Sequence, residues 1–262
     1  MKTMRRLVGG ALGALMVGWF PGHALAAPFV SGSTGADGVF APQTSMQVQL
    51  PESGMLNFTT VNIPSGVTVT FKKNSTNAPV TILATGDVII NGTLDVSGAD
   101  GASVVDAISA DDTLPGVGGP GGFAGGFGAS KSVPGSLGGG GLGPGGGKPG
   151  PGYFGGSTTF AMGGGGGGFG ADGTDSSGTS GLKGLAYGTA SLLPMIGGSG
   201  GGGGASTASY NGSGGGGGGG AVLIASSGSI QVAGAIRANG GKGGYAYSNN
   251  CGGSAGGGGG GS

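Results

Sequence analysis

Apolar and polar residues alternate along residues 56–98, and the apolar ones take every second position within short runs. A period of two is typical of β-strands with one buried face, and the abundance of Val, Ile, Thr and Phe favours strand over helix. Turn residues such as Pro64-Ser65-Gly66 and Asn91-Gly92 separate the runs. The side chains expected on the buried face are Leu56, Phe58, Val67, Val69, Phe71, Val80, Ile82, Ala84, Val88, Ile90, Leu94 and Val96. The pattern predicts an all-β protein.

One strand-turn-strand pattern occurs twice in the chain. Residues 85–101 align without a gap with residues 227–243, so that Gly86 matches Gly228 and Gly98 matches Gly240. A weaker third copy at 64–69 places Gly66 twenty residues before Gly86. Units that cannot bury their own faces stack on one another, so we expect a small parallel β-solenoid core. An antiparallel sandwich or barrel is the alternative, because corners such as Asn91-Gly92 also suit hairpins.

Glycine accounts for 76 of the 262 residues, and its uneven distribution divides the chain after residue 26 into four regions. We expect a strand-rich region at 27–98, a glycine-rich region at 99–220, a β repeat returning to the core at 221–243 and a glycine-rich tail at 244–262. Glycine-rich sequence buries too little apolar surface to offset its backbone entropy, which favours disorder. Extended three-residue-per-turn polyglycine helices that pack side by side and bond through their backbones are the alternative.

The first 26 residues have the pattern of a signal peptide. Lys2, Arg5 and Arg6 precede an apolar run, and Ala24-Leu25-Ala26 is a small-residue cleavage motif. The run is shorter than the roughly 20 residues that a membrane span needs. We therefore expect cleavage after Ala26, a bacterial chain that is secreted or displayed on the cell surface, and no membrane span in the mature chain.

Removal of this segment excludes several kinds of chemistry. His23 leaves with it, so the mature chain has no histidine for a catalytic triad or for a histidine-ligated metal. Three of ten basic residues leave and all ten acidic residues stay, for a formal charge of about −3. Without a basic patch or a P-loop we expect no nucleic-acid partner and no cofactor. Cys251 is the only cysteine, so its one possible disulfide is intermolecular, with a small buried or tolerated thiol as the alternative.

Two groups of acidic residues are candidate sites. The segment Gly167–Asp175 begins like a calcium-binding nonapeptide, which makes Asp172 and Asp175 candidate calcium ligands, although Asp is also a common turn residue. Asp111-Asp112 is a candidate carboxylate pair for a polysaccharide-active enzyme, with a solvated turn as the alternative. No other catalytic group is predicted.

Aromatic residues are spaced among the glycines and are candidates for surface contact with a glycan or a protein receptor, because rings supply large contact areas at low entropy cost. The alternative is that they anchor the glycine-rich region by burial. The candidate contact residues are Tyr153, Phe154, Phe160, Phe169, Tyr187 and Tyr210.

The strand motifs at 56–98, followed by GGPGGF, GGGGGGFGADG and GGGGGGGAVLIASSGSIQVAGAIRANGG, resemble a group of exported glycine-rich bacterial proteins with strands similar to parallel β-helices. The resemblance implies a surface or extracellular location and no established reaction. We expect a structural or adhesive surface protein that is not an enzyme, with a polysaccharide-active lyase or hydrolase as the alternative. Residues 254–261 repeat the glycine lead-in at 211–220, and an uncapped final strand would be an edge for head-to-tail or lateral self-association.

Overall fold

The computed structural model describes residues 28–104, 110–155, 158–176, 180 and 182–245. The predicted signal peptide and Cys251 lie outside these residues. Within them the protein is mostly β, and its only helical element is the short 3-10 helix η1 (Ala110–Thr113). The strands are β1 (Gly38–Phe40), β2 (Met46–Gln49), β3 (Met55–Ile63), β4 (Thr68–Lys72), β5 (Val80–Ala84), β6 (Val88–Ile90), β7 (Thr93–Asp95), β8 (Gly152–Gly155), β9 (Thr158–Ala161), β10 (Val222–Ser226), β11 (Ile230–Val232) and β12 (Ala235–Arg237).

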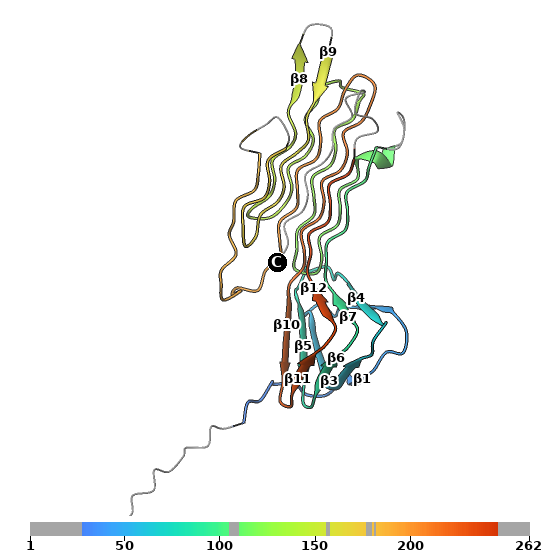
Figure 1. Ribbon diagram of the computed structural model, residues 1–262, viewed down its shortest axis with the longest axis vertical. Helices are drawn as coiled ribbons and strands as arrows, with labels where there is room; N and C mark the ends of the chain where they lie inside the picture. Colours follow the sequence, from blue (N-terminus) through green and yellow to red (C-terminus); the bar gives the residue numbers. More distant parts are fainter. Residues whose placement is uncertain (1–27, 105–109, 156–157, 177–179, 181, 246–262) are drawn as a thin grey trace, which may run out of the picture.

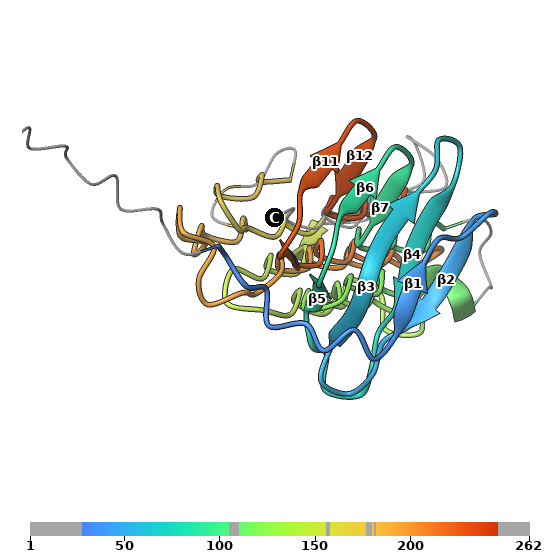
Figure 2. The same ribbon diagram turned by 90° about the horizontal axis from the view of Figure 1, so that it is seen from below.

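Ten of these strands form two sheets in which every pair is parallel. The first sheet has the order β10-β5-β3-β6-β11, with β1 also paired to β3. It curls because the long β3 pairs with β5 through Met55–Phe58 and with β6 through Val61–Ile63. The second sheet has the order β12-β7-β4-β2. Figure 2 shows β11, β6, β3 and β1 side by side in that order. The antiparallel sandwich or barrel is therefore wrong.

The internal repeat predicts the pairing of the last three strands. Val222 pairs with Val80, Ile230 with Val88 and Ala235 with Thr93. This is the same register as the alignment of 85–101 with 227–243, so that alignment is confirmed. The weaker third copy has the wrong register: Thr68 pairs with Thr93, which puts the turn at Gly66 beside the corner at Gly92 and not beside Gly86.

The core lies between the two sheets and consists of alternating side chains from both. Every side chain predicted for the buried face is buried. Leu50, Val61 and Ile63 also belong to this core, and Phe40 stacks on Phe58 with ring centroids 4.9 Å apart. β-Branched side chains pack well on a pleated surface, which explains why this composition forms sheets.

The glycine-rich segments pack side by side through backbone hydrogen bonds. The bonds recur at every third residue: Gly214, Gly217 and Gly220 donate to the carbonyls of Ala102, Ala99 and Val96. This ordered packing agrees with the second alternative for the glycine-rich region and argues against disorder in these segments. Residues 238–244, which we expected to belong partly to the core repeat, also join them: Gly241 and Gly244 donate to Gly217 and Gly214.

We call the packed glycine-rich segments the glycine bundle. The glycine runs 200–204 and 214–220 lie in its interior. The run 214–220 bonds to backbone at 96–102, at 116–119, at 123–126, at 198–201 and at 241–244. A side chain has no room there: a Cβ on Gly218 would lie 1.8 Å from the carbonyl oxygen of Gly198. Glycine is used at these positions because neighbouring backbones approach from several directions, as at the crowded axis of collagen.

The molecule is elongated, with the two parallel sheets at one end and the antiparallel hairpin β8–β9 at the other (Figure 1). The glycine bundle lies between them. The chain passes directly from the sheets into the bundle after β7 and after β12, and it returns to the sheets just before β10. At this junction the N–H of Gly98 donates to the carbonyl of Asn239, and the N–H of Gly220 donates to that of Val96. Sheets and bundle therefore share one hydrogen-bonded framework.

Candidate functional site

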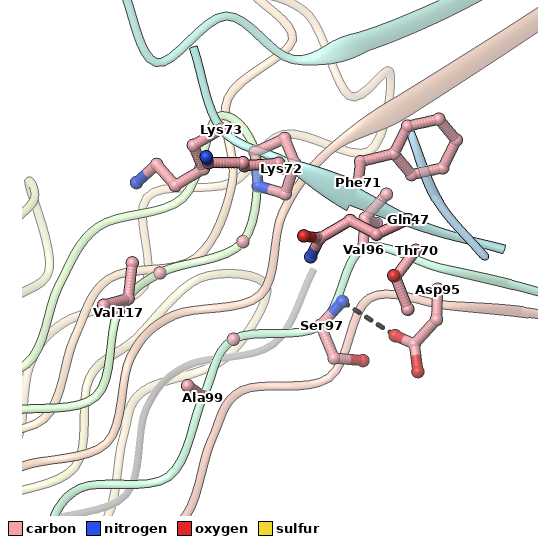
Figure 3. Close-up of a pocket in the computed structure, with 14 residues that line it drawn as sticks. Gln47, Thr70, Phe71, Lys72, Lys73, Asp95, Val96, Ser97, Ala99 and Val117 are labelled. Carbon is pink, nitrogen blue, oxygen red and sulfur yellow. Dashed lines mark hydrogen bonds between the residues drawn. The ribbon is translucent and has the colours of Figure 1, made fainter. Parts of the chain in front are cut away.

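A groove with a volume of about 580 Å³ lies where the second sheet meets the glycine bundle (Figure 3). We call it the junction groove. Strands β2, β4 and β7 supply one side, and the backbone at 117–120 supplies the other. Its lining residues are Gln47, Thr70, Phe71, Lys72, Lys73, Asp95, Val96, Ser97, Gly98, Ala99, Val117, Gly118, Gly119 and Pro120.

A row of polar side chains crosses the strands at this groove. Gln47 pairs with Thr70, Thr70 pairs with Asp95, and Asp95 pairs with Arg237 on the neighbouring strand. Each of the four is next to a residue that lies in the core or packs against it, and therefore points to the outer face of the sheet. Gln47, Thr70 and Asp95 line the groove, and Arg237 continues the row beyond the lining residues. Parallel strands are about 4.8 Å apart, so an amide, a hydroxyl, a carboxylate and a guanidinium follow one another at that spacing. We call these four residues the polar ladder.

Two lysines lie at the side of the groove nearest the bundle. Lys72 is exposed, whereas Lys73 is half-buried and its Nζ donates to the carbonyl of Gly122 at 3.0 Å. Burial lowers the pKa of the Lys73 ammonium below its usual value. Figure 3 shows the two lysines next to each other, and it shows Asp95 accepting a hydrogen bond of 2.8 Å from the backbone N–H of Ser97. That bond holds the Asp95 carboxylate in place at the opposite side.

The groove suits recognition of a hydroxyl-rich ligand better than it suits hydrolysis. Its polar groups include donors and acceptors, and the exposed Val117 supplies apolar surface beside them, whereas Phe71 and Val96 turn their side chains into the core. Glycosidases use a pair of carboxylates across the scissile bond, and among the lining residues Asp95 carries the only carboxylate. Such an arrangement can bind a polar ligand by hydrogen bonds without an evident acid–base pair.

The candidate calcium ligands hold a loop together through local bonds. Asp175 Oδ1 accepts from the backbone N–H groups of Leu182 and Lys183, at 2.7 and 2.9 Å. Asp172 accepts from Ala186 N–H at 2.9 Å and forms an ion pair of 3.0 Å with Lys183. The Ala186 bond, helped by Lys183, lowers the pKa of Asp172. These bonds favour the turn role, and in the described part of the chain no three Asp, Glu, Cys or His residues gather as a possible metal site.

The candidate carboxylate pair lies on η1, where its two members have different surroundings. Asp111 is exposed, whereas Asp112 is buried. The carbonyl of Asp111 accepts from Leu114 N–H, which closes the helical turn. Neither residue lines the junction groove. The structure therefore does not bring this pair to the groove that offers room for a polysaccharide.

Two of the predicted contact residues are packing residues. Phe169 is buried and meets Tyr187 edge-to-face, with ring centroids 5.4 Å apart. The hydroxyl of Tyr187 donates to the carbonyl of Gly197 and accepts from Ser199 Oγ. Burial raises the pKa of Tyr187. For Phe169 the role of exposed contact residue is therefore wrong, and the alternative that aromatic rings anchor the glycine-rich region holds for this pair.

The other contact candidates are placed through their backbones. Tyr153 and Phe154 lie on β8 and Phe160 on β9, where Tyr153 pairs with Phe160. Their hairpin is the end of the molecule farthest from the sheets (Figure 1). Tyr210 lies in the turn before the central glycine run, and its N–H donates to Thr207 Oγ1. The contact role of these four residues stays a prediction.

The sequence did not reveal the polar ladder. Each member is an ordinary outward-facing residue of a short strand, and only the register between β2, β4, β7 and β12 brings the four into one row. β2 itself was not predicted, because the run at 46–49 alternates Gln with Met and Val only briefly. The available signal was the alternation of apolar and polar residues within β4 and β7, but it does not specify the neighbouring strands.

Comparison of the chain with protein-family models, with curated proteins and with solved structures finds no match. Among the described residues no helix is long and apolar enough to cross a membrane. The geometry of the molecule itself therefore supports the proposals that follow.

Proposed function

We propose that this chain is an exported structural or adhesive surface protein that binds a carbohydrate in the junction groove. The observation that carries the proposal is the polar ladder, in which an amide, a hydroxyl, a carboxylate and a guanidinium line up across four parallel strands beside apolar surface. A chain of sugar rings offers hydroxyl groups at its edges and apolar patches on its faces. A groove with both kinds of surface complements it.

We further propose that the parallel sheets are a short β-solenoid and that the glycine bundle consists of polyglycine helices. The repeat of one strand register between β5–β7 and β10–β12 supports the first statement. Hydrogen bonds at every third residue support the second, because an extended helix with three residues per turn presents one backbone group to the same neighbour at that interval. Such a framework is rigid without a large apolar core and suits a protein that works by display and contact.

Binding to immobilised polysaccharides tests the adhesive role. We expect the chain that starts at Ala27 to bind at least one of cellulose, chitin, alginate and pectate in a saturable manner. Replacing Asp95 and Gln47 together by Ala removes two hydrogen-bonding groups and is expected to weaken that binding about tenfold or more. Gln231→Ala is the matched control, because Gln231 is an exposed polar strand residue on the other sheet.

Two results would overturn the proposal. One is the absence of binding to all four polysaccharides by a folded chain. The other is cleavage of a polysaccharide that is lost in Asp111→Asn or Asp112→Asn, which would favour the enzyme alternative. Binding that the ladder variant leaves unchanged would remove the junction groove from the account.

A further inference from the structure

The last three strands form an apolar layer that nothing in the described chain covers completely. β10, β11 and β12 are edge strands, each bonded on one side to the strand 142 residues earlier. In the covered layer Val88, Ile90 and Leu94 are 0 % exposed. Their partners Ile230, Val232 and Ile236 are 48 %, 45 % and 40 % exposed. The side chains of the last layer thus have the same register and apolar character as those of the core but face solvent.

A neighbouring loop extends this apolar surface. A cavity of about 410 Å³ lies between β10, β12 and the loop at 191–196. Leu192 and Leu193 of the loop are exposed, and Met195 and Ile196 also line the cavity. We call the surface formed by Leu192, Leu193, Leu223, Ile230, Val232 and Ile236 the open end. Contiguous apolar surface of this kind, next to unpaired strand edges, marks an interaction site.

Residues 246–262 do not have the side chains to cover the open end. Residues 246–262 follow the last described segment, and Tyr247 is their only large apolar or aromatic side chain. Residues 1–26 are the predicted signal peptide. Six exposed aliphatic side chains need an apolar partner surface, which a glycine- and serine-rich tail does not offer.

The opposite edge of the sheets differs from the open end and does not match it. β2 carries Gln47 and Gln49 between its apolar residues, and the register of β1 shifts between Gly38 and Val39. Polar side chains and bulges of this type protect edge strands from pairing. Val39 and Met46 are exposed on this edge, at 69 % and 43 %, but the irregular register of β1 interrupts the strand pairing that head-to-tail stacking would need.

We propose that two copies of this chain associate through their open ends, face to face. Such a contact uses the same surface on both copies and closes after two subunits, as in the common twofold dimers. Repulsion does not oppose it, because Arg237 is the only charged residue between Val222 and Ala238. Phe29 and Val30 are exposed beside the open end, where Ser31 N–H donates to Ser227 Oγ at 3.0 Å, and they extend the apolar surface of each copy. The proposal concerns assembly and does not rest on carbohydrate binding.

Light scattering coupled to size-exclusion chromatography tests the dimer. The chain that starts at Ala27 is measured over roughly a hundredfold range of concentration, with a reductant present so that a Cys251 disulfide is not counted. We expect a dimer whose dissociation constant rises at least about tenfold in Val232→Lys and in Ile236→Lys, because each change puts a charge into the apolar contact. Met46→Lys is the matched control: Met46 is exposed to a similar degree, at 43 %, on the opposite edge.

Circular dichroism and thermal unfolding establish that each variant is folded. Amide hydrogen exchange of β10–β12 in the unmodified chain is a second measurement of association, and it needs no variant. We expect these amides to exchange more slowly in concentrated than in dilute protein. A monomer at all concentrations would overturn the proposal, and so would a dimer that the two open-end variants leave intact. Polymers that Met46→Lys also disrupts would show head-to-tail stacking instead.

Discussion

At the scale of single residues, the position of each glycine in the bundle decides what it contributes. Gly218 lies in the central run, and its missing side chain lets the Gly198 carbonyl approach. Gly170 lies at the surface, where a Cβ would meet nothing within 4 Å. Two residues with the same side chain therefore differ in their tolerance of a single methyl group, and this difference is measurable.

We predict that Gly218→Ala destabilises the protein by about 1–3 kcal/mol or more, because the added Cβ collides with backbone that is held by hydrogen bonds on several sides. Gly170→Ala should change the free energy of unfolding by no more than about 0.5 kcal/mol. Urea unfolding followed by circular dichroism measures both. Equal stability of the two variants would mean that the central run is not tightly packed.

Tyr187 gives a prediction about pH. Burial raises its pKa in the folded state above that in the unfolded state. The stability that the neutral phenol contributes is therefore fully present below the unfolded pKa of about 10 and is lost as the pH rises through the folded pKa. Tyr187→Phe should lower stability at neutral pH by about 1 kcal/mol, since the hydroxyl bonds to Gly197 and Ser199 disappear.

The same variant should also lose part of the decline in stability above pH 10, because it has no phenol to ionise at this position. Urea unfolding at a series of pH values from neutral to alkaline measures the difference. An unchanged alkaline slope in Tyr187→Phe would show that this phenol is not buried in the folded protein.

At the scale of elements, the sequence predicts the sheets better than it predicts the groove. The alternation at 56–98 identifies the buried face, and the repeat identifies β10–β12 as the strands that pair with β5–β7. The register predicted from the third copy is wrong because the copy is short and consists mainly of a turn. Gly66 can be aligned with Gly86 or with Gly92, and the structure places it beside Gly92. Pairing across the strands determines the polar ladder, and no local pattern encodes the neighbours of Thr70 on β2 and β7.

The glycine segments were the elements least open to prediction. Backbone entropy and backbone hydrogen bonding oppose each other there, and composition alone does not say which is larger. The deciding feature is the number of neighbours: the run 214–220 bonds to five other segments of the chain. An isolated glycine run has none of these partners, so its order depends on the whole bundle.

At the scale of the whole molecule, backbone pairing is the common principle of both halves. Parallel strands bond to strands in the sheets, extended glycine segments bond to one another in the bundle, and residues around Gly98 and Gly220 connect the two. The junction groove and the open end both lie on this framework. Their proposed roles in carbohydrate binding and in assembly depend on its being ordered.

Amide hydrogen exchange of the central glycine runs, 200–204 and 214–220, tests this order most directly. The N–H groups of Gly201, Gly215 and Gly218 each donate to a neighbouring segment, so we expect them to exchange slowly, at rates comparable to those of the β5 amides. Exchange at the rate of an unstructured chain in these runs, while β5 remains protected, would contradict the account.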